Sequence, residues 1–387
     1  MRDNTLCVQH PHISRDGFAS LAVPTYRAST IVYPDAQSFL DRKHRGPDGY
    51  TYGLHGTPTT RTLEAQISAL HGAERTMLVP SGQAAVSMVF LGLLTPGDRV
   101  LIPDNVYPPV RNFCAEYLRP RGIAFAVYDP MIGAGIADLI DDRTRLVWVE
   151  SPGSGTMEVQ DLPAIAEAAH ARGALVGIDN TWATGLLFKP LDHGADIVSE
   201  ALTKYVGGHS DLLLGSISVR DLGIRKKIKD VLGMLGIGVS PDEAALALRG
   251  IETMAVRLAH MGRVSVDMAR RLAASPLIEK VLHPALPSCP GHEVFLRDFK
   301  GASGLFSVVL KPAAAERLAA GMDALKVFAI GASWGGTRSL LAPQLIGQDR
   351  SVTPWPHKGP LLRISIGLED PEDLWADLQH MLAVLAG

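Results

Sequence analysis

Cysteine is scarce in this chain of 387 residues, with three in all, Cys7, Cys114 and Cys289. Their odd number and wide spacing exclude a disulfide framework and a Cys-x-x-Cys metal or redox motif. The chain also lacks an uninterrupted run of eighteen or more apolar residues that could cross a bilayer, and its opening stretch, MRDNTLCVQHPHISRD, lacks the apolar core of a signal peptide. We therefore expect a cytoplasmic protein without a membrane span.

Basic charge is limited as well. Lys and Arg number 37 against 40 Asp and Glu, and no basic run is long enough to follow a phosphate backbone, so nucleic acid is not an expected partner. No GxGxxG follows a predicted strand, which argues against a nicotinamide dehydrogenase. His10 and His12 lack further metal-ligand spacing, and His209 is expected to be a hydrogen-bonded loop residue, so we predict no metal.

The 47% of hydrophobic residues can form a large core, and the order of the predicted elements indicates an α/β fold. Residues 1–55 have little periodicity and predict an extended arm that must lie on another surface. In residues 56–245, apolar strands such as RVLIP, RLVWVE and ALVGID alternate with helical stretches, which indicates a parallel sheet covered on both faces. Residues 246–387 predict a smaller α/β domain that begins with a long helix or a helix pair.

Two opposite charges follow successive predicted strands. Asp179 ends ALVGID, and Lys204 follows the apolar run ADIVSEAL. Ligands of parallel sheets bind outside the carboxyl ends of the strands. A lysine that can form a Schiff base and a carboxylate that keeps a pyridine nitrogen protonated together suit pyridoxal phosphate. Taken singly, a solvated lysine and an aspartate that caps the next helix stay open as alternatives.

Three weaker signals fit the same cofactor. Gly82 and Gln83 open a helix directly after a strand, and the free N–H groups of such a helix favour a phosphate. Thr203 could add a hydroxyl donor. Tyr107 follows the strand RVLIP at the end of the sheet where an aromatic ring could stack on the cofactor. The alternatives are a plain helix cap and a packing tyrosine.

Arg363 suggests the substrate. It lies among apolar residues of LLRISIG on a predicted strand, and a guanidinium there suits the carboxylate of an amino acid. A buried structural ion pair is the alternative. The segment ASWGG, residues 332–336, predicts a tight loop that lines the same pocket.

The motifs extend over nearly the whole chain: YGLHGTPTTRTLE, ESPGSGTMEVQDLPAI, IDNTWATGLLFKPLDHGADI, TKYVGGHSDLLLGSIS and LLRISIGLEDPEDL. On these motifs the sequence resembles the Cys/Met-metabolism (trans-sulfuration) family of fold-type I pyridoxal phosphate enzymes. Within it, the Trp of DNTW and the Gly-Ser of ESPGS are most similar to the bacterial cystathionine β-lyases. The resemblance implies an aspartate-aminotransferase-like large domain with a mainly parallel sheet. It also implies a methionine-biosynthesis lyase that cleaves cystathionine to homocysteine, pyruvate and ammonia through an aminoacrylate.

The resemblance implies a role for each candidate residue. It makes Lys204 the Schiff-base lysine and catalytic base, with Asp179 at the pyridine nitrogen and Tyr107 stacked on the ring. The implied phosphate and substrate-carboxylate ligands are, respectively, Gly82, Gln83 and Thr203, and Arg363, Ser333 and Trp334. Alternatives within the family are a cysteine-conjugate β-lyase, a γ-lyase and a γ-synthase; outside it, a cofactor-binding regulatory protein with vestigial lyase activity.

The resemblance further implies a homotetramer of catalytic dimers. In that arrangement Tyr52 of the arm reaches the cofactor of a neighbouring subunit. One departure concerns Leu54, which stands where the family has an arginine that binds the neighbour's phosphate. His55 or Arg61 could replace that arginine, or the helix cradle could suffice without it.

Overall fold

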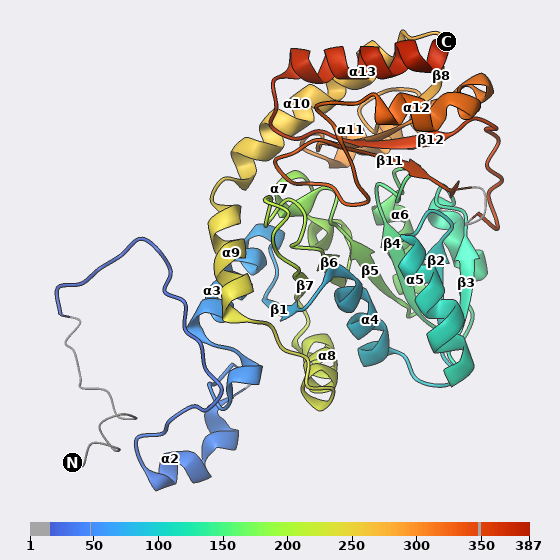
Figure 1. Ribbon diagram of the computed structural model, residues 1–387. Helices are drawn as coiled ribbons and strands as arrows, with labels where there is room; N and C mark the ends of the chain where they lie inside the picture. Colours follow the sequence, from blue (N-terminus) through green and yellow to red (C-terminus); the bar gives the residue numbers. More distant parts are fainter. Residues whose placement is uncertain (1–15, 47, 347–349) are drawn as a thin grey trace.

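The structure is a computed structural model that describes residues 16–46, 48–346 and 350–387. Cys7, His10 and His12, with the first fifteen residues of the predicted arm, lie outside the described residues. Two sheets form the body, and the segment before α3 extends away from it (Figure 1). Within the described ranges, no helix has the length and apolar character needed to cross a membrane.

The larger sheet has seven strands in the order β1-β7-β6-β5-β4-β2-β3. Its strands β2 to β6 pair in parallel, which confirms the mainly parallel sheet. Strand β7 was not predicted and runs antiparallel between β1 and β6. Its sequence GSISV lacks an apolar run because the buried Ser216 and Ser218 alternate with the apolar positions. The strands are β1 (Arg75–Val79), β2 (Arg99–Pro103), β3 (Ala124–Tyr128), β4 (Thr144–Glu150), β5 (Leu175–Asp179), β6 (Ile197–Glu200) and β7 (Gly215–Val219).

Helices cover both faces of this sheet, which explains why its strands are apolar throughout. On β4, Val147 and Val149 face the cluster that contains α6, whereas Leu146 and Trp148 face the cluster that contains α4 and α8. The helices of this part are α3 (Pro58–His71), α4 (Gly82–Leu93), α5 (Pro108–Asn112), α6 (Leu162–Ala171), α7 (Thr184–Leu187), α8 (Leu222–Met234) and α9 (Pro241–Ile251).

The second sheet has five strands in the order β10-β11-β12-β9-β8 and a separate core. Helix α9 spans the predicted domain boundary at 245/246 and packs on α3, so the division itself stays a prediction. The elements of this part are α10 (Met254–Ala273), β8 (Ile278–Leu282), α11 (His292–Asp298), β9 (Leu305–Leu310), α12 (Leu318–Asp323), β10 (Ala329–Ile330), β11 (Leu340–Gln344), β12 (Leu361–Ser365) and α13 (Pro371–Ala386).

The described part of the arm contains α2 (Ala36–Leu40) and makes polar contacts with the body. The Tyr26 N–H donates to Thr59 Oγ1 at 2.8 Å, and Arg27 pairs with Asp242 at 2.6 Å. Apolar side chains along the arm, Leu21 among them, are exposed. Exposed apolar surface of this kind is typical of a segment that packs on a partner, which favours contact with another subunit. That contact stays a prediction.

Candidate active site

A cavity of about 240 Å³ lies at the carboxyl ends of the parallel strands, between the two sheets. Its lining combines segments that are far apart in the sequence, which only the fold brings together. Eight of the ten predicted site residues line it: Gly82, Gln83, Tyr107, Asp179, Thr203, Lys204, Trp334 and Arg363. Of the other two, Ser333 touches the cavity's lysine and Tyr52 lies elsewhere.

Lys204 lies in the turn after β6 and is half-buried rather than fully solvated. Its Nζ donates to Ser333 Oγ at 2.8 Å and lies 5.3 Å from the centre of the Trp334 ring. Burial and the nearby Arg363 lower the pKa of Lys204 to about 8, against the opposing effect of Asp179. The amine is therefore easily deprotonated, as a nucleophile and proton acceptor must be.

The ASWGG loop, predicted to line the pocket, contributes Ala332 and Trp334 to it and also lies directly against Lys204. Gly335 has φ +85°, and a Cβ there would lie 3.2 Å from the Lys204 backbone. A Cβ at Gly336 would lie 2.2 Å from Ser210 Oγ. Glycine at both positions thus allows the loop to approach the lysine this closely.

Asp179 ends β5 and accepts the Thr181 N–H at 2.9 Å. Burial raises the pKa of its carboxyl, and among the described residues no cationic side chain forms an ion pair with it. It is not a simple cap of the following helix, because it lines the cavity. A carboxylate in this position needs a cation from a ligand.

Glu150 is a site residue that the sequence analysis missed. It ends β4 directly opposite Asp179 in the sheet register, and its Oε2 accepts the Tyr107 N–H at 2.7 Å. Burial, and then Asp179, raise the pKa of Glu150 well above its usual value. The signal that identified Asp179, a carboxylate at the end of an apolar strand, could also have identified Glu150.

The predicted phosphate cradle lies at the start of α4. Ser81 caps the helix by accepting the Ala84 N–H. The N–H groups of Gly82 and Gln83, in the first turn, have no intrahelical partners. A Cβ at Gly82 would lie 2.5 Å from Ala201 Cβ, so glycine is needed there. Gln83 Oε1 is buried without a hydrogen-bond partner. Thr203 lines the cavity, but its hydroxyl donates to Leu214 O at 3.1 Å.

Arg363, on β12, is buried and donates to the carbonyl oxygen of Ala332. Burial lowers the pKa of its guanidinium. In the described part of the chain no carboxylate pairs with it, which argues against the structural ion pair left open above. A guanidinium that lines a cavity without a carboxylate partner is suited to bind an anionic ligand.

The arm residues lie outside this cavity. Tyr52 is exposed, and its hydroxyl accepts a hydrogen bond from Ser29 Oγ at 3.2 Å. Arg61 does not compensate within its own chain for Leu54, because its guanidinium donates to Glu64 and to the His55 carbonyl oxygen, both at 2.6 Å. Burial, Lys229 and Arg61 lower the pKa of His55, which disfavours the charged imidazole that a phosphate would prefer.

These features define the class of protein. The easily deprotonated amine of Lys204 fits an aldehyde, the unpaired carboxylate of Asp179 fits a pyridinium, and the start of α4 fits a phosphate. The site therefore suits pyridoxal 5'-phosphate. The chain belongs to the family of Cys/Met metabolism PLP-dependent enzymes, whose profile matches residues 4–383.

Relatives within the family differ in activity. The chain is 39% identical over 362 residues to cystathionine beta-lyase MetC of Escherichia coli, covering 91% of each chain. It is 36% identical over 397 residues to the L-alanine/L-glutamate racemase of Wolbachia pipientis wMel, covering 100% of this chain and 98% of that one. The crystal structure of cystathionine gamma synthase from Xanthomonas oryzae pv. oryzae superposes with a TM-score of 0.87 at 29% identity, covering 96% of this chain and 95% of that one.

Proposed function

We propose that this enzyme is a carbon–sulfur β-lyase that cleaves L-cystathionine and water into L-homocysteine, pyruvate and ammonia. The observation that carries the proposal is the position of Lys204 and the unpaired Arg363 in one cavity. An α-amino acid held by its carboxylate at Arg363 would present its Cα to a basic amine. The similarity to the Escherichia coli lyase supports β-elimination among the reactions of the family.

Each residue has a distinct proposed task. Arg363, with Ser333 and Trp334 beside it, binds the substrate carboxylate. Pyridoxal phosphate, when bound, supplies an electron sink for the pair released at Cα. Lys204 holds the cofactor at rest and removes the Cα proton through Nζ, after which the thiolate leaves Cβ. Asp179 keeps the pyridine nitrogen protonated.

Three residues complete the proposed cofactor site. Tyr107 would stack on the pyridine ring, and the N–H groups of Gly82 and Gln83 would bind the phosphate. The hydroxyl of Thr203 can only assist as a donor if it gives up its bond to the Leu214 carbonyl oxygen.

The arm belongs to the same proposal. We infer a cytoplasmic homotetramer in which Tyr52 of one subunit reaches the cofactor of its neighbour. Its exposure in the single chain and the exposed apolar side chains of the arm support this arrangement. The division into a cofactor domain at 56–245 and a smaller domain at 246–387 is likewise proposed.

The test combines an absorbance spectrum with a product assay. The holoenzyme should show the band of lysine-bound pyridoxal phosphate and release pyruvate and homocysteine from cystathionine. Lys204→Ala should lose the band and nearly all turnover. If 2-oxobutyrate forms instead, the enzyme is a γ-lyase; D-amino acids would indicate racemisation, and negligible turnover with a normal band would indicate a regulatory protein.

A further inference from the structure

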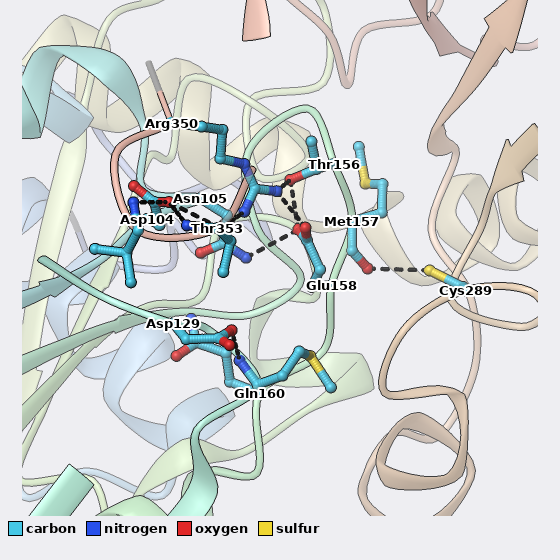
Figure 2. Close-up of polar contacts among 12 residues, drawn as sticks. Asp104, Asn105, Asp129, Thr156, Met157, Glu158, Gln160, Cys289, Arg350 and Thr353 are labelled. Carbon is cyan, nitrogen blue, oxygen red and sulfur yellow. Dashed lines mark hydrogen bonds and ion pairs between the residues drawn. The ribbon is translucent and has the colours of Figure 1, made fainter. Parts of the chain in front are cut away.

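The connection between β11 and β12 leaves the second sheet and binds the first part of the chain beside the cavity. Its residues 350–353, which we call the strap, contact the turn after β2 and the loop after β4 (Figure 2). Both segments contribute lining residues, Tyr107 after the turn and Ser154 in the loop. The strap then leads back to β12, whose third residue is Arg363. It therefore connects the strand of Arg363 to the segment of Tyr107.

The first anchor of the strap is Asp104, whose side chain is completely buried. Its carboxylate accepts the backbone N–H groups of Ser351, Val352 and Thr353 at 2.9, 2.9 and 2.7 Å. It also accepts the Thr353 hydroxyl at 2.8 Å and the Arg111 guanidinium at 2.6 Å. Although burial opposes ionisation, these donors hold the pKa of Asp104 well below its usual range. Consecutive N–H groups around one carboxylate form an anion nest.

The second anchor is Arg350, whose side chain is 5% exposed. It forms an ion pair with Glu158 and donates to Thr156 Oγ1 at 2.9 Å (Figure 2). Glu158 in turn accepts Asn105 Nδ2 at 3.2 Å, and the Asn105 carbonyl oxygen accepts the Ser154 N–H at 2.9 Å. Arg350 thus ties the strap to the loop and the turn that flank the cavity.

Polar anchors, rather than apolar burial, hold the strap in place. Val352 is 48% exposed, and Ser351 is exposed as well. A segment with so little apolar cover can open locally while the rest of the protein stays folded. Removing one anchor should therefore release the strap without unfolding either sheet.

We propose that Asp104 and Arg350 are positioning residues that, through the strap, set the place of Arg363 relative to Tyr107 and the cofactor. Neither lines the cavity that holds Lys204. The inference rests on the proposed binding of a substrate carboxylate by Arg363. When the strap detaches, fewer molecules are competent to bind substrate, and the apparent affinity falls in proportion to that fraction.

The experiment uses Asp104→Asn and Arg350→Gln in the full-length holoenzyme. Three quantities are measured: the dissociation constant of L-alanine from the change it causes in the cofactor band, KM and kcat with cystathionine, and amide hydrogen exchange at 351–353. We expect the dissociation constant and KM to rise about tenfold or more. We expect kcat to change less than about threefold, because molecules that bind substrate retain Lys204. Exchange at 351–353 should accelerate.

Asp377→Asn is the matched control. The Asp377 carboxylate accepts three consecutive backbone N–H groups, those of Lys326, Val327 and Phe328, at 2.8, 2.8 and 2.9 Å. Asp377 lies on α13, and neither it nor its three donors line the cavity. The control should lower Tm and accelerate exchange at 326–328, yet leave the dissociation constant of L-alanine unchanged.

The inference is overturned if Asp104→Asn and Arg350→Gln lower Tm as the control does but bind L-alanine like the wild type. Equal loss of affinity in the control would overturn it too. If Asp104→Asn does not fold, Arg350→Gln, which keeps the nest, decides the question. Failure of the wild type to release pyruvate from cystathionine would refute the proposed function instead, because binding of L-alanine requires no leaving group at Cβ.

Discussion

Replacing Lys204 should stabilise the cofactor-free protein. The pKa of this lysine falls from its usual value near 10.5 to about 8 because the side chain is buried and Arg363 is close. Each pH unit corresponds to about 1.4 kcal/mol, so holding the charged amine in the cavity costs about 3 kcal/mol. Lys204→Met keeps an unbranched apolar stem but loses the bond to Ser333, worth about 1 kcal/mol. The expected net gain at pH 7 is about 2 kcal/mol.

The stability of the wild type should rise with pH as the charge on Lys204 is lost. Below pH 8 the amine is charged in both states, and the whole cost is present. Between about 8 and 10.5 the unfolded chain binds more protons than the folded one, so wild-type stability rises with pH. In Lys204→Met this part of the rise should disappear. The advantage of the variant should therefore shrink as the pH rises and reverse above about pH 10.5, where only the lost bond to Ser333, worth about 1 kcal/mol, separates the two proteins.

Urea unfolding of the cofactor-free proteins from pH 7 to pH 10.5 measures both effects. Lys226→Met is the control, because this lysine is 76% exposed and pairs with Asp230 on the surface. Its stability should stay within about 0.5 kcal/mol of the wild type. If Lys204→Met is less stable than the wild type at pH 7, or keeps the same rise above pH 8, then the cavity does not destabilise the charged amine and the reasoning is refuted.

Three further predictions concern single positions. Asp179→Asn removes the cavity carboxylate that lacks a cationic partner. It should weaken binding of pyridoxal phosphate by roughly tenfold to a hundredfold, measured by titration of the cofactor-free protein. Unchanged affinity would contradict the proposed contact with the pyridine nitrogen. Gly335→Val adds a Cβ at φ +85° and 3.2 Å from the Lys204 backbone; it should lower the free energy of unfolding by about 2 kcal/mol or more in urea, whereas a neutral effect would show that the loop is free to move. Burial lowers the pKa of His283 to about 4, so stability should fall by about 3 kcal/mol between pH 6.5 and 4, where the unfolded chain binds the extra proton. His283→Gln should lack that loss, and an unchanged acid transition would contradict the assignment.

The sequence alone was sufficient for much of the architecture, because local patterns determine it. Runs such as RVLIP and ALVGID are apolar on both faces, and each became a central parallel strand. Strand β7 escaped prediction because its buried Ser216 and Ser218 interrupt the apolar pattern, and its place in the sheet depends on pairing with the remote strand β1. The Thr76 and Ser218 hydroxyls bond across the β1–β7 pair at 2.8 Å, a contact between segments 142 residues apart.

For the candidate site too, some features followed from the sequence and others only from the tertiary structure. That Lys204 and Asp179 follow neighbouring strands was determined by the sequence, since the carboxyl ends of parallel strands meet at one edge of a sheet. Whether a buried charge has a partner depends on side chains that arrive from remote segments. Only the tertiary structure therefore decided that Arg363 lacks a carboxylate partner, that Glu150 lies beside Asp179, and that Asp104 holds a strap nearly 250 residues further along the chain.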